Sequence, residues 1–277
     1  MTKKIIEARV IGNQEIIDGI FRITLDCNDA EYGNAKPGQF INLYLRDKSM
    51  LLPRPISICL TEKKRITLVY RVVGNGTKEL SSLKEQDSLR ISTPLGQGYH
   101  IEAMFEALRQ DPSDRKTIAL VAGGLGIPPM LELAKTIRAQ IEADPRIKLI
   151  ALLGFREEPF LTEELSGFCH EVHAATETGI IGFPGTVLEL IKMKNIVADY
   201  FLSCGPKPML NALAAHCHKT NKPLQVSLEE RMGCGYGACV GCTCKTKKEK
   251  DGRMIVVPQK VCKDGPVFFG EEVIWSE

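Results

Sequence analysis

The pattern of the sequence changes near residues 109–116, and this change constrains the fold more than any other feature. Before it, short runs rich in β-branched residues, separated by turns such as PGQ and GNG, predict a small antiparallel β-barrel or sandwich. After it, apolar strands alternate with helical runs, which is typical of a parallel, doubly wound α/β sheet. We therefore expect a multidomain chain with an antiparallel β-barrel over residues 1–103 and an α/β domain over residues 104–226.

The remaining residues, 227–277, form a third, small predicted domain. After Glu230 this segment is dominated by cysteine, glycine and lysine and shows little regular pattern. It includes the basic stretch KTKKEKDGR (residues 245–253), which we interpret as a solvated loop.

The composition excludes several classes of partner. The 36 basic residues nearly balance the 34 acidic ones, so neither nucleic acid nor an anionic membrane is expected as a partner. The N-terminal stretch lacks the long apolar core of a signal peptide, and glycine and proline interrupt the most apolar run, residues 118–134. These features predict a cytoplasmic protein.

The chain has ten cysteines, which fall into two groups. Scattered cysteines are most simply buried thiols, whereas clustered thiols in a cytosolic chain more often hold a metal than form disulfides. The scattered group is Cys27, Cys59, Cys169, Cys204 and Cys217, and the clustered group is Cys234, Cys239, Cys242, Cys244 and Cys262.

The clustered cysteines have the spacing of a plant-type [2Fe–2S] site, C-x4-C-x2-C followed by a distant fourth cysteine. A zinc ribbon is the alternative, but zinc sites usually pair two C-x2-C motifs, which an x4 gap fits poorly. We expect Cys244 to be a spare thiol. The metal ligands are therefore predicted to be Cys234, Cys239, Cys242 and Cys262.

Two stretches of the predicted barrel could bind an anion. The stretch RPISI (residues 54–58) offers the planar donor fork of an arginine, and VYRVVGNGT (residues 69–77) offers backbone N–H groups and a hydroxyl. The simpler alternative for both is a barrel turn with a structural arginine.

The stretch VAGGLGIPPM (residues 121–130) runs from a strand through three glycines into a helix that begins with two prolines. Glycines at such a turn let a ligand approach the backbone at the positive end of a helix. The G-x-G-x-x-G dinucleotide fingerprint is absent, so a glycine-rich structural turn remains an alternative.

Together and in this order, RPISI, VAGGLGIPPM and the cysteine stretch resemble the ferredoxin-reductase superfamily. The tail sequences SLEERMGCGYGACVGCTC and VCKDGPVF most resemble the electron-transfer subunits of the NAD-dependent, two-subunit dihydroorotate dehydrogenase. The resemblance covers essentially the whole chain. It implies FAD on the barrel, NAD on the α/β domain and a [2Fe–2S] cluster in the C-terminal domain.

By this resemblance, Arg54 would hold the FAD pyrophosphate and Ser57 would lie near the reactive flavin edge. Many ferredoxin reductases have a flavin-stacking tyrosine between these two positions, where this chain has Pro55 and Ile56, so another group must cover the flavin face. The residues that would flank the flavin or meet its phosphates are Pro55, Ile56, Val69, Tyr70, Arg71, Gly76 and Thr77.

The resemblance also implies positions for NAD. Its pyrophosphate would face the glycine turn, and SCGPKPM resembles a superfamily motif that lies beside the nicotinamide. NAD rather than NADP follows from resemblance alone, and Arg156 could favour a 2′-phosphate. The implied NAD residues are Gly123, Gly124, Gly126, Cys204 and Gly205.

In the family, a separate FMN-containing catalytic subunit oxidises dihydroorotate to orotate, and electrons pass through the cluster and FAD to NAD+. The resemblance thus implies an oxidoreductase subunit of pyrimidine (UMP) biosynthesis, in a heterotetramer with two copies of each subunit. No residue of this chain is expected to act as acid or base on dihydroorotate. The alternatives are a ferredoxin:NAD(P) or sulfide dehydrogenase reductase subunit and a zinc-stabilised nucleotide-binding module without a redox role.

Overall fold

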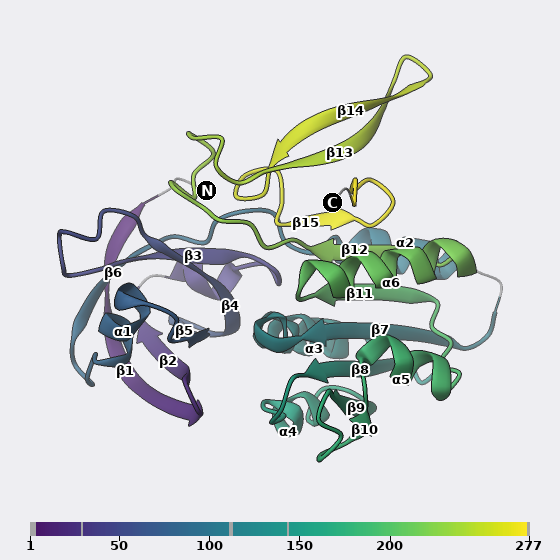
Figure 1. The fold of residues 1–277 in the computed structure, drawn as a ribbon, viewed down its shortest axis with the longest axis horizontal. Helices are drawn as coiled ribbons and strands as arrows, with labels where there is room; N and C mark the ends of the chain where they lie inside the picture. Colours follow the sequence, from purple (N-terminus) through teal and green to yellow (C-terminus); the bar gives the residue numbers. More distant parts are fainter. Residues whose placement is uncertain (1–3, 29, 111–112, 143, 276–277) are drawn as a thin grey trace.

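The computed structural model describes residues 4–28, 30–110, 113–142 and 144–275. Two bodies lie side by side in Figure 1, a β-barrel formed by the purple and blue N-terminal part and a larger helix-covered sheet in teal and green. The yellow C-terminal segment passes over both of them. None of the helices in the described ranges is long and apolar enough to cross a membrane.

Six strands close the barrel in the order β1-β2-β5-β4-β3-β6, and every neighbouring pair is antiparallel. Their inward side chains form one apolar core that includes Ile23, Leu43 and Ile66, all fully buried. The predicted antiparallel barrel is confirmed. Its strands are β1 (Ile5–Ile17), β2 (Ile20–Asp26), β3 (Phe40–Tyr44), β4 (Arg54–Glu62), β5 (Arg65–Arg71) and β6 (Ser88–Ser92), with the 3-10 helix η1 (Ala30–Asn34) and helix α1 (Asn75–Ser81) between them.

The second body is a seven-stranded sheet in the order β10-β9-β8-β7-β11-β12-β15. Six of its strands run parallel, as predicted, but β15 pairs antiparallel with β12 at one edge. The strands are β7 (Lys116–Gly123), β8 (Ile147–Phe155), β9 (Glu171–Thr176), β10 (Phe183–Pro184), β11 (Tyr200–Cys204), β12 (Leu224–Ser227) and β15 (Val267–Phe269).

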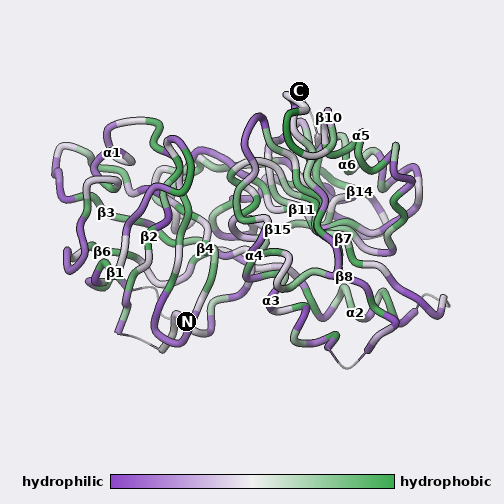
Figure 2. The backbone as a smooth tube through the Cα atoms, turned by 90° about the horizontal axis from the view of Figure 1, so that it is seen from below, coloured by the Kyte–Doolittle hydropathy of each residue, from purple (hydrophilic) through white to green (hydrophobic). Residues whose placement is uncertain are grey.

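Helices cover both faces of this sheet. Along β7, Ile118 and Leu120 face one apolar cluster while Ala119 and Val121 face the other, the alternation expected of a strand buried on both sides. Figure 2 shows these apolar strands in green between more hydrophilic outer segments. The helices are α2 (Ile101–Gln110), η2 (Gly124–Gly126), α3 (Pro128–Ile141), α4 (Thr162–Ser166), α5 (Val187–Met193) and α6 (Lys207–Thr220).

The order of the strands reverses direction between β7 and β11. After β7 the chain adds β8 and β9 on one side, and it then returns to place β11 and β12 on the other. The carboxyl ends of β7 and β11 therefore diverge into different connections, and such a switch point is where doubly wound sheets bind ligands.

The C-terminal segment is more regular than the sequence predicts. The stretch interpreted as a loop instead belongs to a long antiparallel hairpin of β13 (Thr243–Lys250) and β14 (Arg253–Lys260). This hairpin projects away from both bodies (Figure 1). β13 is almost wholly polar because both of its faces meet solvent over most of its length, so it carries no hydrophobic alternation to reveal a strand.

The division of the chain into three domains stays a prediction. The predicted boundary between residues 103 and 104 falls inside α2, and the boundary between 226 and 227 falls inside β12. The tail also supplies β15 to the sheet of the central body. The third segment is therefore built into the second rather than separated from it by a linker.

Candidate functional site

A cavity of about 340 Å³ lies where the barrel, the sheet and the tail meet. It gathers segments that are far apart in the sequence, although a larger hollow of about 650 Å³ exists elsewhere, between α6 and the tail. None of the predicted site residues lines that larger hollow. Ten of them line the 340 Å³ cavity: Arg54, Pro55, Ile56, Ser57, Val69, Tyr70, Arg71, Thr77, Gly126 and Cys204.

The barrel brings its two predicted stretches together through strand pairing. β4 and β5 run antiparallel with Glu62 opposite Arg65 at their shared turn, so the start of β4 lies beside the end of β5. Arg54–Ser57 and Val69–Arg71 therefore share one end of the barrel and form one wall of the cavity. The other wall comes from the sheet body and from residues 227–232.

Arg54 and Gly76 meet at this end of the barrel. A Cβ added at Gly76 would lie 2.4 Å from the Arg54 guanidinium, so only glycine lets that side chain lie against the first turn of α1. Arg54 also donates to the Leu52 carbonyl at 2.5 Å. Gly76 thus shapes the position of Arg54 without lining the cavity itself.

Thr77 lines the cavity, but its hydroxyl is engaged locally. The hydroxyl oxygen accepts from the N–H groups of Val73 at 2.9 Å and Gly74 at 3.2 Å, and it donates to the Gly74 carbonyl. These bonds fold the turn that precedes α1. A direct contact from Thr77 to a phosphate stays a prediction.

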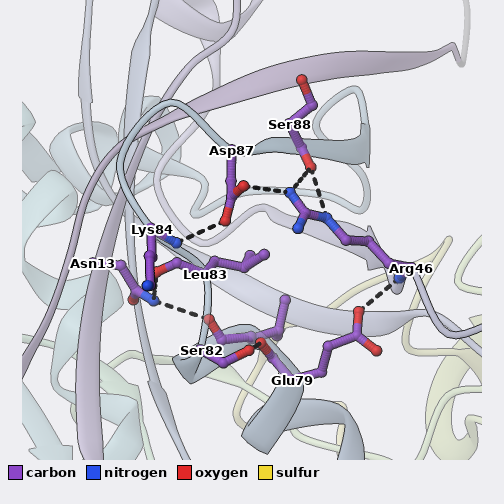
Figure 3. Close-up of polar contacts among 9 residues, drawn as sticks. Asn13, Arg46, Glu79, Ser82, Leu83, Lys84, Asp87 and Ser88 are labelled. Carbon is purple, nitrogen blue, oxygen red and sulfur yellow. Dashed lines mark hydrogen bonds and ion pairs between the residues drawn. The ribbon is translucent and has the colours of Figure 1, made fainter.

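Side chains from two other parts of the barrel hold the far end of α1 (Figure 3). The Asn13 amide donates to the carbonyl oxygens of Leu80 and Leu83 at 2.9 and 3.0 Å. The backbone N–H of Arg46 donates to Glu79, and the Arg46 guanidinium pairs with Asp87 at 3.0 Å. This network fixes the helix whose first turn carries Gly76 and Thr77.

Tyr70 lines the cavity but is tied into the barrel. Its hydroxyl donates to Asn13 Oδ1 at 3.2 Å, and its ring stacks on Phe21 with centroids 5.9 Å apart. Burial raises the pKa of this phenol well above its usual value. Tyr70 is therefore a neutral part of the wall.

The glycine turn after β7 packs directly against the turn after β11. A Cβ at Gly126 would lie 2.2 Å from the Cys204 carbonyl oxygen, and one at Gly205 would lie 2.9 Å from the Gly123 nitrogen. Gly124, with φ of +52°, supplies the left-handed residue of the turn. The glycines are needed for this close approach, and of the four predicted here only Gly126 also lines the cavity. Contacts of Gly123, Gly124 and Gly205 with NAD stay predictions.

Cys204 ends β11 and is half-buried. Burial raises the pKa of its thiol to about 12, although the Ser227 hydroxyl acts in the opposite direction. It is therefore a neutral thiol near pH 7, suited to packing against a ligand rather than to nucleophilic attack. The other four scattered cysteines are buried, as predicted.

Sequence reasoning missed about half of the cavity wall. Phe40 lies opposite Ser57 in the pairing of β3 with β4, a contact that periodicity could not reveal. Glu229 and Glu230 stand in the stretch SLEERMGC. The family resemblance of this stretch was the only signal in the sequence that could have pointed to them. The missed lining residues are Phe40, Val73, Leu125, Pro128, Ser227, Leu228, Glu229, Glu230, Met232 and Pro266.

The four predicted iron ligands form two pairs. The N–H of Cys239 donates to Cys234 Sγ at 3.4 Å, and the two side chains also interact. The N–H of Cys262 donates to Cys242 Sγ at 3.5 Å, and these two side chains interact as well. The structure thus brings together cysteines that are as many as 20 positions apart in the sequence.

The thiols differ in their electrostatic surroundings. Burial disfavours ionisation of Cys234, but N–H groups of Cys239 and Tyr236 donate to its sulfur and lower its pKa to about 6. Burial raises the pKa of Cys262 to about 12, and the neighbouring Cys242 adds to this rise. Binding to a metal would require each of these thiols as a thiolate.

Cys244 belongs to neither pair, although it packs against the apolar cluster that contains Cys242 and Cys262. It is in β13 opposite Gln259, and it lines a separate hollow of about 260 Å³ together with Lys207 and Trp275. Burial raises its pKa to about 11. This placement supports, without testing, the prediction that Cys244 is a spare thiol.

The paired arrangement fits a two-iron cluster. Each iron of such a cluster takes two protein thiolates, whereas one tetrahedral zinc ion takes four ligands around a single point. The two cysteine pairs therefore match the donor set of a [2Fe–2S] cluster, and the ligand assignment itself stays a prediction.

Comparisons with known proteins agree with this site. Residues 229–274 match the family model described as the iron–sulfur cluster binding domain of dihydroorotate dehydrogenase B. The chain is similar to two proteins named dihydroorotate dehydrogenase B (NAD(+)), electron transfer subunit. The relative from Caldanaerobacter subterraneus subsp. tengcongensis is 38% identical over 97% of this chain and 98% of the relative. The relative from Clostridium acetobutylicum is 34% identical over the whole of both chains.

Solved structures show the same architecture. An NADH-dependent reduced ferredoxin-NADP oxidoreductase, described in the context of flavin-based electron bifurcation, has a TM-score of 0.77 and 25% identity over 97% of this chain and 90% of that one. The ferredoxin reductase of carbazole 1,9a-dioxygenase has a TM-score of 0.64 at 15% identity, over 82% of this chain and 69% of that one. The second likeness shows the fold alone.

Proposed function

The chain belongs to the family of electron transfer subunits of NAD-dependent dihydroorotate dehydrogenase B, and we propose that it links an FMN-containing catalytic subunit to NAD+. In this function, the four paired cysteines would hold a [2Fe–2S] cluster and the barrel would hold FAD, and these groups would carry electrons from dihydroorotate oxidation to NAD+. The reaction on dihydroorotate takes place on the catalytic subunit, and pyrimidine biosynthesis is the process served.

One observation carries the proposal most strongly: the cavity and the cysteine loop share a continuous piece of chain. Glu230 and Met232 line the cavity, and Cys234 follows two residues later. The same cavity is lined by Arg54 and Ser57 from the barrel and by Cys204 from the sheet. Predicted flavin, nicotinamide and iron sites are thus adjacent, as a chain of electron carriers requires.

The barrel residues fit a flavin. FAD would supply the exchange between single electrons and a hydride, while the protein binds and orients it. Arg54 presents a guanidinium at one end of the cavity, and Ile56 and Val69 contribute apolar wall. Leu125, Gly126 and Cys204, at the carboxyl ends of β7 and β11, line the same cavity, and a nicotinamide would meet the flavin there.

The partner is expected to dock at the cluster end. Val240 lies between Cys239 and Cys242, and its side chain is 74% exposed. Met254 and Val256, on the hairpin that connects Cys242 to Cys262, are 64% and 61% exposed. Exposed apolar residues on the cluster loop and along the hairpin offer a surface for the catalytic subunit, from which electrons must arrive. The proposed assembly has two copies of each subunit.

Co-purification tests this proposal. We expect the native protein, isolated without oxygen, to carry FAD, iron and acid-labile sulfide and to bring with it a roughly equimolar FMN-containing subunit. The zinc-stabilised module would be supported instead by two results together. The isolated protein would be colourless and contain zinc but no acid-labile sulfide, and reconstitution with FAD, iron and sulfide would also fail.

A second candidate function is a ferredoxin:NAD(P) reductase component. The observation that favours it is the likeness, over 97% of this chain, to the NADH-dependent reduced ferredoxin-NADP oxidoreductase. Arg156 follows β8 and is exposed, so it is free to meet a 2′-phosphate. Measuring NADPH formation from reduced ferredoxin, beside NADH formation from dihydroorotate with the catalytic subunit present, separates the two functions.

A further inference from the structure

We propose that Asn42, with the hydroxyl pair of Tyr44 and Tyr236, positions the cysteine loop on the flavin barrel and thereby tunes the cluster. This inference rests on the proposed function, since it concerns how the predicted cluster is held beside the predicted flavin site. Asn42, Tyr44 and Tyr236 are positioning residues, because they act through Cys234 rather than on a reacting atom.

Asn42 connects the two sites directly. Its side-chain amide donates to the Cys234 carbonyl at 3.0 Å, across 192 positions of sequence. In β3 it lies opposite Pro55, which lines the cavity, and its own N–H donates to Ser92 Oγ at 2.9 Å. The fully buried side chain of Asn42 therefore attaches a predicted iron-ligand residue to the strand that pairs with the flavin wall.

The approach of Asn42 depends on the residue after Cys234. Gly235 has φ of +74°, and a Cβ added there would lie 2.5 Å from Asn42 Nδ2 and 2.7 Å from Oδ1. Asn42 Oδ1 is buried and has no hydrogen-bond partner in the described part of the chain. Burying an amide oxygen that has no hydrogen-bond partner costs free energy. The hydrogen bond that the same amide donates to the cysteine loop offsets part of this cost.

A second contact ties down the next side chain of the loop. The hydroxyls of Tyr44, in β3, and Tyr236 are hydrogen-bonded to each other. The guanidinium of Arg90, in β6, lies 5.9 Å from the centre of the Tyr44 ring. The loop is thus fixed to the barrel at Cys234 and at Tyr236.

The contacts that hold Tyr236 also position its backbone N–H group beside Cys234. Its N–H donates to Cys234 Sγ at 3.4 Å. Hydrogen bonds to the sulfurs are one of the means by which a protein sets the potential of an iron–sulfur cluster, since they stabilise the more negative, reduced form. Holding Tyr236 against Tyr44 keeps this donor in place, and loosening the loop would weaken it.

The test compares cluster potentials in intact protein loaded with both cofactors. The variants are Asn42→Ala, Tyr44→Phe and Tyr236→Phe, and the matched control is Tyr200→Phe, which loses a buried hydroxyl that accepts from Gln225 at 2.9 Å, far from the loop. We expect Asn42→Ala to weaken stabilisation of the reduced cluster about tenfold, which is about 59 mV toward negative potential for a one-electron couple. Tyr44→Phe and Tyr236→Phe should shift the cluster potential in the same direction by a smaller amount, and each should change the electron paramagnetic resonance spectrum of the reduced cluster.

Each outcome of this test either supports or overturns the positioning role of Asn42, Tyr44 and Tyr236. Loss of the cluster from Asn42→Ala with FAD retained also supports the inference, since the loop then no longer holds its binding geometry. Potentials and spectra equal to those of the wild type in Tyr44→Phe and Tyr236→Phe would overturn it, even if Asn42→Ala fails to fold. A wild-type protein that binds neither cofactor would instead reject the proposed function, so the two failures are distinguishable.

Discussion

The carbonyl oxygen of Cys204 lies against Gly126, so closely that a Cβ at position 126 would come within 2.2 Å of it. This contact joins the turn after β7 to the turn after β11 at the switch point of the sheet. Neither turn can move away without disturbing the cavity, because Gly126 and Cys204 both line it.

Replacing Gly126 with alanine should therefore push the two turns apart. We expect a loss of about 1–3 kcal/mol in stability from overpacking and a clear weakening of NADH binding, with FAD retained. Fluorescence titration with NADH and chemical denaturation would measure the two effects. Gly154→Ala is the control, since its Cβ would make ordinary 3.5 Å contact with Val187. Equal NADH affinities in both variants would contradict this account of the turn.

Serine substitutions of the clustered cysteines should separate ligands from the spare thiol. We expect Cys234→Ser, Cys239→Ser, Cys242→Ser and Cys262→Ser each to lose the [2Fe–2S] cluster, while Cys244→Ser keeps it, because Cys244 lines a different hollow. Iron and acid-labile sulfide analysis with a visible spectrum gives the answer. Bleaching by Cys244→Ser alone would show that the ligand assignment is wrong.

The hydrogen bonds from Asn13 to the end of α1 should contribute both to the free energy of unfolding and to the retention of FAD. Asn13→Ala leaves the carbonyls of Leu80 and Leu83 without their amide donor, so we expect a loss of about 1–3 kcal/mol and faster release of FAD. Arg46→Ala removes a solvent-exposed ion pair to Asp87 from the same network and should destabilise the protein less than Asn13→Ala does. Denaturation monitored by circular dichroism, and flavin fluorescence for release, distinguish them. Indistinguishable variants would show that α1 is held by other contacts.

A charge on the exposed surface beside the cluster should weaken docking. We expect Val240→Asp to reduce binding of the catalytic subunit at least tenfold, because a carboxylate would have to be desolvated at the interface, with both cofactors retained. Ile180→Asp is the control, since Ile180 is 83% exposed and belongs to the α/β body. Calorimetry or analytical ultracentrifugation measures the affinity. A loss of binding in Ile180→Asp alone would place the interface on the sheet body.

The sequence predicts those parts of the fold that have a local pattern. The barrel and the parallel strands carry β-branched runs and regular turns, and both were predicted correctly. The hairpin was missed because β13 is polar on both faces, and β15 was missed because three residues carry too little periodicity. Local pattern thus reveals the longer elements that bury a face, and it misses a strand that is solvated on both faces and a buried strand of only three residues.

The candidate site divides in the same way. Arg54 and the four paired cysteines stand in short motifs whose spacing is visible in the sequence. Phe40 and Asn42 do not, since their importance comes from strand register and from a contact 192 positions away. Nor could the sequence indicate that Gly123 and Gly205 serve the packing of two turns.

The most direct test of the central claim is anaerobic NADH formation from dihydroorotate and NAD+ in a mixture of this chain with the catalytic subunit, which we propose contains FMN. We predict a rate well above the sum of the separate subunits, and a return to that sum when Cys262→Ser, which lacks the cluster, replaces the wild type. No gain in rate on mixing wild-type protein that carries FAD and the cluster would contradict the account.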